Sequence, residues 1–230
     1  MRALQVASSS LACVPRWPMG MYVGQLGPRP EQRFVLYEFE ACPYCRKVRE
    51  ALTMLDLEVE IRPCPKGGER FRPAVVARGK SMFPFLVDDN TGEAMWESND
   101  IVAHLYRNYG VTAPPLMLRL GPLTNLLCSL AGLFRPGFGY SARPSREPAL
   151  PLELWSFDIS PFCRLVREEL SALELPHILH NVGKRSPSRP AFVQRSGRMM
   201  VPYLLDPNTG AEMFESAEIV DYLRRTYGKP

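Results

Sequence analysis

The sequence lacks the marks of several classes of protein. Six cysteines in 230 residues show no dense, even spacing and follow no secretory signal, which argues against a secreted disulfide framework and favours a reducing compartment. No apolar run reaches about 18 residues, and the most apolar stretch, 116–134, is interrupted by Arg119 and Pro122, so no membrane span is expected. With a net charge of +4, the chain also lacks dense Lys/Arg clusters. We therefore expect small anionic ligands and no nucleic-acid partner.

What the sequence does contain is an internal repeat with an offset of 118 residues. Residues 36–110 and 154–228 align without a gap and share about 30 identities. A period this long excludes a solenoid of short repeats and predicts two copies of a compact domain. The predicted divisions are a lead-in segment (1–32), a first domain (33–112), a linker with an apolar helix (113–150) and a second domain (151–230).

The lead-in segment also resembles an organelle transit peptide in composition, because it has arginines and three consecutive serines but no acid before Glu31. The offset of 118 pairs Pro18 with Pro136, however, and a cleaved leader has no reason to have a counterpart in mid-chain. We therefore predict two matching segments, 1–30 and 113–150, each a short apolar helix followed by a Pro/Gly-rich loop. The expected location is cytoplasmic, and a plastid or another organelle is the alternative if the first segment is a transit peptide.

Each copy shows the order strand, helix, strand, connector, strand, strand, helix. In the first copy, Val48, Leu52 and Leu55 have the spacing of a half-buried helix, and Ser98 is a predicted N-cap. The predicted elements are strands over 34–39, 58–62, 83–88 and within 89–97, and helices over 43–55 and 98–110. Every element recurs in the second copy, which predicts an α/β fold for both.

The motif Cys-Pro-Tyr-Cys stands where the first strand meets the first helix. The free N–H groups at a helix start favour an anion, so this position favours a reactive thiolate at Cys42. Cys45, one turn deeper, is placed to attack a mixed disulfide formed at Cys42. A structural zinc site needs four ligands, and no second pair accompanies this one, so we expect redox chemistry and no metal. The second copy has Ser160 and Cys163 at the same positions.

Two further patterns recur near this junction. Pro84 and Pro202 each stand at the first position of a buried strand; cis bonds there would turn the backbone of the preceding residue toward Cys42 or Ser160. Each copy also has a Glu-Ser pair at a helix start. A serine there binds a carboxylate well and the glutamate can hold an ammonium group, although simple N-capping explains the serine equally well.

Together these motifs resemble the glutaredoxin-like, thioredoxin-fold N-terminal domain of glutathione transferases, present twice. The resemblance implies a four-stranded mixed sheet with flanking helices in each copy, cis prolines, and glutathione as co-substrate. It implies a first glutathione site at Tyr44, Phe83, Pro84, Glu97 and Ser98. It implies a second site at Ser160, Cys163, Val201, Pro202, Glu215 and Ser216.

Three departures from the family pattern bear on activity. No all-helical domain follows either copy, which counts against conjugating transferase activity. Glu38 and Glu40 stand near Cys42, and their charge opposes a thiolate there. In the second copy, Ser160 takes the place of the outer thiol. Its role is either to hold the glutathione thiolate or to act as a plain N-cap.

The leading hypothesis is an enzyme, a glutathione-dependent thiol–disulfide oxidoreductase that acts on disulfide or glutathionylated proteins. Cys42 is the expected nucleophile and Cys45 the resolving thiol, and the second domain is degenerate or only binds glutathione. The alternatives are a non-catalytic glutathione- or protein-binding module, a glutathione transferase-like activity, and an iron–sulfur carrier that uses Cys42 and glutathione across a dimer.

Overall fold

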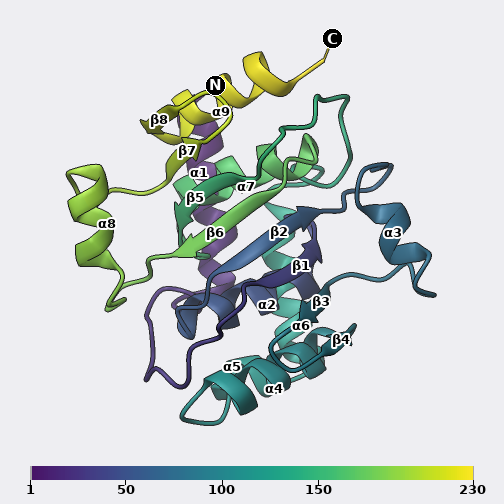
Figure 1. Ribbon diagram of the computed structural model, residues 1–230. Helices are drawn as coiled ribbons and strands as arrows, with labels where there is room; N and C mark the ends of the chain where they lie inside the picture. Colours follow the sequence, from purple (N-terminus) through teal and green to yellow (C-terminus); the bar gives the residue numbers. More distant parts are fainter. Residues whose placement is uncertain (1, 230) are drawn as a thin grey trace.

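The computed structural model describes residues 2–229, and both copies of the repeat fold into the predicted succession of elements (Figure 1). The strands are β1 (Phe34–Glu38), β2 (Val59–Pro63), β3 (Phe85–Asp88), β4 (Glu93–Met95), β5 (Leu152–Ser156), β6 (His177–Asn181), β7 (Tyr203–Asp206) and β8 (Ala211–Phe214). The helices of the first half are α1 (Arg2–Cys13), the 3-10 turn η1 (Val14–Arg16), α2 (Pro43–Met54), α3 (Arg72–Val76) and α4 (Ser98–Tyr109). The remaining helices are α5 (Leu116–Arg119), α6 (Pro122–Leu133), α7 (Pro161–Ala172), α8 (Arg189–Ser196) and α9 (Ser216–Tyr227).

The strands of both copies form one continuous sheet in the order β4-β3-β1-β2-β6-β5-β7-β8. Within each copy the first two strands are parallel and the other neighbours are antiparallel, which gives the mixed sheet implied by the family resemblance. The two halves join where β2 pairs antiparallel with β6. Glu60 lies opposite Ile178, its own counterpart in the repeat, so a pseudo-twofold axis passes between these residues.

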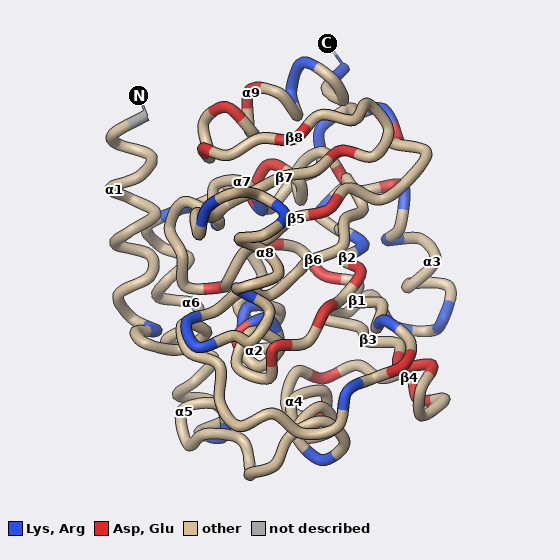
Figure 2. Tube along the Cα trace, turned by 60° about the vertical axis from the view of Figure 1, so that its left-hand side comes forward, with Lys and Arg blue, Asp and Glu red and all other residues tan. Residues whose placement is uncertain are grey.

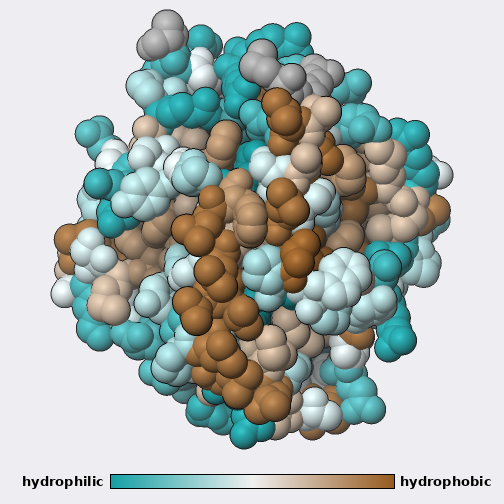
Figure 3. Space-filling model, turned by 180° about the vertical axis from the view of Figure 1, so that it is seen from behind, coloured by the Kyte–Doolittle hydropathy of each residue, from teal (hydrophilic) through white to brown (hydrophobic). Residues whose placement is uncertain are grey.

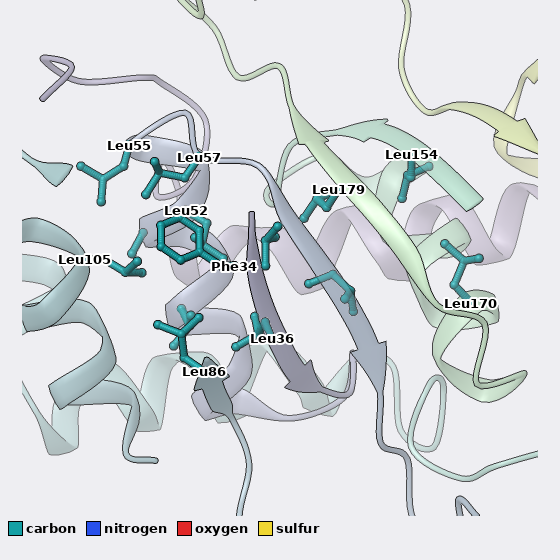
Figure 4. Packing of buried hydrophobic residues seen from close by; sticks show 14 of the residues in the cluster. Phe34, Leu36, Leu52, Leu55, Leu57, Leu86, Leu105, Leu154, Leu170 and Leu179 are labelled. Atoms are coloured by element: carbon teal, nitrogen blue, oxygen red, sulfur yellow. The ribbon is translucent and has the colours of Figure 1, made fainter. Parts of the chain in front are cut away.

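The largest apolar core lies between this sheet and helices α2, α4, α7 and α9. Phe34 and Leu36 of β1 point to the same face because side chains alternate along a strand, and they pack against Leu52 of α2 (Figure 4). The same core continues without a break into the second copy through Leu154 and Leu170. Full burial of a leucine stabilises the folded state by about 1.5–3 kcal/mol, so this shared core is a major contribution to stability.

The helices that precede each copy are exchanged between the copies. Helix α1 packs against α7 of the second copy, and α6 packs against α2 of the first. The following loops are exchanged as well, since the Met21 carbonyl accepts the Lys184 N–H at 2.7 Å and the Tyr140 carbonyl accepts the Lys66 N–H at 2.7 Å. The donors Lys66 and Lys184 keep the offset of 118, but the acceptors Met21 and Tyr140 are 119 residues apart, so the predicted pairing of Pro18 with Pro136 is wrong by one residue.

Reciprocal ion pairs cross between the copies near the pseudo-twofold axis. Arg49 Nε lies 3.1 Å from Asp158 Oδ1, and its counterpart Arg167 donates from Nε to Glu40 Oε2 at 2.9 Å. All four side chains are buried. Although burial alone would raise the pKa of Glu40, Arg167 and Arg49 hold that pKa below its ordinary value. The two copies therefore complete each other's charge pairing.

Helices α1 and α6 cover the side of the molecule that faces away from the viewer in Figure 1. Seen from behind, this side carries a band of hydrophobic side chains (Figure 3). Figure 2 marks charged residues along the strands and along α9, and few along α1. Within the described residues, no helix is long and apolar enough to cross a membrane.

Candidate active site

Cys42 lies at the start of α2, as the sequence motif predicts. It has the extended backbone of an N-cap residue, and its sulfur accepts the N–H of Cys45 at 3.2 Å. Pro43 occupies the first helical position, where no N–H partner is needed. The Cys42 side chain is 4% exposed, so a substrate has to reach the sulfur through a narrow approach. The sulfur therefore occupies the position at a helix start that stabilises an anion.

Cys45 is buried completely beneath Cys42 and is a free thiol. Burial is the main cause that raises its pKa well above the ordinary value, and the neighbouring Cys42 and Glu38 raise it further. Cys45 is therefore a neutral thiol at physiological pH. It is placed behind the outer sulfur but is a weak nucleophile until it loses its proton.

The two acids that precede Cys42 in the sequence are paired in the structure. Glu38 is bound to Arg49, and Glu40 is bound to Arg167 of the second copy. Burial raises the pKa of Glu38 to about 7, with Arg49 opposing the shift. Each carboxylate near Cys42 therefore lies against a buried arginine, which opposes the effect of its charge on the thiol.

The loop before β3 brings a backbone carbonyl to the thiol. The Phe83–Pro84 bond is cis, as the resemblance implies, and the Phe83 carbonyl oxygen lies 3.7 Å from the Cys42 sulfur. Phe83 itself is half-buried, and the Arg72 guanidinium lies over its ring at 4.7 Å. This cation supplies positive charge beside the loop, and the sequence pattern did not single it out.

Glu97 and Ser98 lie at the start of α4. Ser98 is the first helical residue and Glu97 holds the cap position, so the prediction of Ser98 as the N-cap is wrong by one residue. Glu97 adopts a φ of 68°, which is uncommon for a residue other than glycine and occurs at ligand-binding positions. Glu97 is exposed and Ser98 is buried, while Tyr44 of α2 is 47% exposed.

The second copy reproduces this geometry with an oxygen in place of the sulfur. Ser160 caps α7, and its hydroxyl accepts the Cys163 N–H at 3.3 Å. The Val201–Pro202 bond is cis, and Glu215 has a φ of 65° directly before Ser216. All six predicted residues of the second site therefore occupy positions equivalent to those in the first.

An aromatic side chain from the second copy's lead-in segment lies beside the first site. The Tyr140 ring makes an edge contact with Phe39 at 6.0 Å, beside the first site. Tyr22 lies over the second copy, where the Lys184 ammonium is 5.5 Å from its ring centre. The placement of both tyrosines depends on the exchange of the lead-in segments.

In the part of the chain that the structure describes, no group of three or more His, Cys, Asp or Glu side chains is placed to hold a metal ion. All six cysteines are free and buried.

Comparison with known proteins agrees with this geometry. The family model described as glutathione S-transferase, N-terminal domain, matches residues 36–115 and again residues 154–230. Searches of curated proteins and of solved structures gave no match. The two matched segments together cover more than half of the chain, and each contains one complete copy of the cap, the cis proline and the Glu-Ser pair. The chain therefore belongs to the glutathione S-transferase N-terminal domain family, whose domain it carries twice.

Proposed function

We propose that the protein is a glutathione-dependent thiol–disulfide oxidoreductase with Cys42 as its nucleophile. One arrangement carries this proposal: the Cys42 sulfur caps α2 and faces the Phe83 carbonyl of the cis-proline loop. The helix start favours the thiolate, and the loop offers peptide groups to an extended ligand. Glutathione would lie along Phe83 and Pro84, with its γ-glutamyl end at Glu97 and Ser98 and with Tyr44 beside it.

The reaction would proceed by two exchanges. The Cys42 thiolate attacks the glutathione sulfur of a glutathionylated protein, the protein thiolate leaves and takes up a proton, and a Cys42–glutathione disulfide remains. The thiolate of a second glutathione then attacks that disulfide and releases oxidised glutathione together with the Cys42 thiolate. Over the two exchanges, the glutathionylated protein and one free glutathione give the protein thiol and oxidised glutathione, whose second half comes from the substrate.

Cys45 provides a slower second route by which the Cys42–glutathione disulfide is resolved. Its attack on the mixed disulfide would release glutathione and form a Cys42–Cys45 disulfide, which two further glutathione molecules would reduce. Because its pKa is raised, few Cys45 side chains are thiolates at neutral pH. Glutathione from solution is therefore the faster resolving thiol in this scheme.

We assign no redox turnover to the second domain, residues 151–230. Its Ser160 hydroxyl can donate a hydrogen bond to a bound thiolate but cannot form a disulfide. Glutathione binding at Val201, Pro202, Glu215 and Ser216, together with Cys163 beneath them, is the role this geometry supports. Free thiols throughout the chain also support a reducing compartment, with the cytoplasm as the proposed location.

A second candidate function is a non-catalytic module that binds glutathione or a protein. The observation that favours it is the burial of Cys42, whose 4% exposure is low for a nucleophile that must meet a protein disulfide.

The experiment that separates the candidates is intact-mass measurement after incubation with oxidised glutathione. The enzyme is expected to gain one glutathione or to lose two protons between Cys42 and Cys45, and to reduce a small mixed disulfide with glutathione as the reductant. Cys42→Ser should abolish both results, whereas Ser160→Ala, the matched change in the second copy, should leave them nearly intact. Unmodified wild-type protein, or full activity in Cys42→Ser, would refute the assignment.

A further inference from the structure

A cavity of about 500 Å³ lies in the second copy between α1, α7 and α9. Val6, Leu165, Ala217 and Val220 form part of an apolar wall, and charged residues, among them Glu169, Asp221 and Arg224, also line the cavity. Arg135 and Gln5 line one end. The redox proposal uses none of these side chains, although Ser216 of the proposed second glutathione site also lines the cavity.

The first copy shows what fills the corresponding space. There α2 and α4 are the counterparts of α7 and α9, and α6 takes the place of α1. The short helix α5 packs against both α4 and α6. Its Leu118 is 1% exposed, so this leucine is the side chain that the groove buries. Within residues 2–229, no segment occupies the equivalent volume of the second copy, and the groove there is open.

An arginine marks the same position in both grooves. Arg16 is bound to Glu50, and both terminal nitrogens of Arg16 also lie 3.4 Å from the Met117 carbonyl oxygen of α5. In the second copy, Arg135 is bound to Glu168 in the same way.

The hydrogen bond that α5 supplies to the first arginine is replaced in the open groove. Arg135 Nη2 donates to the side-chain oxygen of Gln5 at 3.3 Å, and Nη1 donates to the Gln5 carbonyl at 3.3 Å and to the Ser8 hydroxyl at 2.9 Å. The Gln5 side chain therefore stands where the first copy has a peptide carbonyl. A bound peptide could offer its own carbonyl to Arg135 and displace that side chain.

The open groove is more apolar than its filled counterpart at two positions, although Ala103 and Tyr106 of the first copy correspond to the charged Asp221 and Arg224. Lys47 and Asn99, which are hydrogen-bonded to each other in the first copy, correspond to Leu165 and Ala217 in the second. Replacing a polar pair by two apolar side chains favours burial of an apolar ligand over contact with water.

We propose that this cavity is a docking site for a partner protein that presents a leucine on a single proline-initiated helical turn. The occupant resembles residues 113–121, whose sequence Ala-Pro-Pro-Leu-Met-Leu-Arg-Leu-Gly forms the turn in the first copy. The leucine enters the pocket between Val6 and Val220, and a peptide carbonyl of the turn accepts from Arg135. This binding does not depend on Cys42 or on redox activity.

The test uses a fluorescently labelled synthetic peptide with the sequence of residues 113–121, titrated into the full chain with fluorescence anisotropy as the readout. We expect saturable binding of one peptide per chain. A peptide with aspartate at the position of Leu118 should bind at least about tenfold more weakly, because the anchor loses its burial. Binding that is equal for the two peptides, or no binding, would overturn the proposal.

Two variants of the protein test whether the peptide binds in this cavity. Ala217→Trp fills the cavity and should weaken binding about tenfold or more. Val220→Asp places a charge on the wall of the cavity, should also weaken binding about tenfold or more, and keeps the test informative if the tryptophan variant does not fold. Unchanged binding in a folded variant would place the peptide elsewhere, for example in exchange with α5, and would overturn the proposal. Displacement of the peptide by reduced glutathione would also overturn it, because the cavity would then belong to the second glutathione site.

Discussion

The substitution His177→Val tests the strand pairing of β2 with β6, which joins the two copies. His177 begins β6, lies opposite Ile61 of β2 and is buried. Its Nδ1 donates to the Leu175 carbonyl at 3.1 Å, and its Nε2 has no hydrogen-bond partner among the described atoms. The first copy has Val59 at this position, also buried, so valine is a side chain that the fold already accommodates here.

The structure predicts how this histidine makes stability depend on pH. Burial lowers the pKa of His177 from 6.5 to about 4, so the folded protein keeps the ring neutral where the unfolded chain would protonate it. The unfolded state then binds more protons between these values, and stability falls as the pH is lowered from about 6.5 to 4. The full loss is about 3 kcal/mol, and about 1.4 kcal/mol of it is reached by pH 5.5.

Urea unfolding of the wild type and of His177→Val, followed by tryptophan fluorescence at pH 7.5 and 5.5, measures the contribution of His177 to the pH dependence of stability. The buried acids titrate in both proteins, so the difference between the two pH dependences isolates the histidine. We expect the wild type to lose about 1.4 kcal/mol more than the variant over this range. Equal losses in the two proteins would show that the ring is protonated in the folded state or that it does not control acid stability.

Two further predictions concern the ion pairs and the inner thiol. Arg167→Met leaves Glu40 buried without its main partner, so the free energy of unfolding should fall by about 3–5 kcal/mol in urea titrations at pH 7.5. Arg143→Met removes an arginine with an exposed side chain from Glu169 and should lower the free energy of unfolding by less than about 1 kcal/mol. Equal losses in the Arg167 and Arg143 variants would contradict the importance of the buried ion pairs. Cys45→Ser should keep most of the glutathione-dependent reduction of a mixed disulfide, because the raised pKa makes Cys45 the slower resolving thiol. Loss of activity comparable to that of Cys42→Ser would assign the resolving step to Cys45.

The features that the sequence predicts well are local ones. The Cys-Pro pair at the start of α2, the apolar spacing of Val48 and Leu52, and the repeat itself each depend on residues close together in the chain or on direct comparison of the copies. They give the α/β fold and place Cys42 at a helix start beside the cis-proline loop. The helix ends shift by one residue, because caps depend on backbone angles that composition does not fix.

The features that the sequence does not reveal depend on contacts between residues more than 100 positions apart. No sequence pattern predicts the pairing of β2 with β6. A strand with alternating apolar and polar residues at the edge of a sheet can face solvent or pair with another strand. Glu40 looks like a free charge beside the thiol until the fold brings Arg167 to it. Tyr140 reaches the first site only because the lead-in segments are exchanged.

This exchange explains why evolution would retain a copy that has lost its outer sulfur. Helix α6, which precedes the serine-bearing copy in the chain, is the one that shields α2 beneath the Cys42 site. Loss of that copy together with its leading helix would uncover the scaffold under the remaining thiol. The two halves thus depend on each other structurally, and the half that bears Ser160 supplies the helix that covers the helix of Cys42.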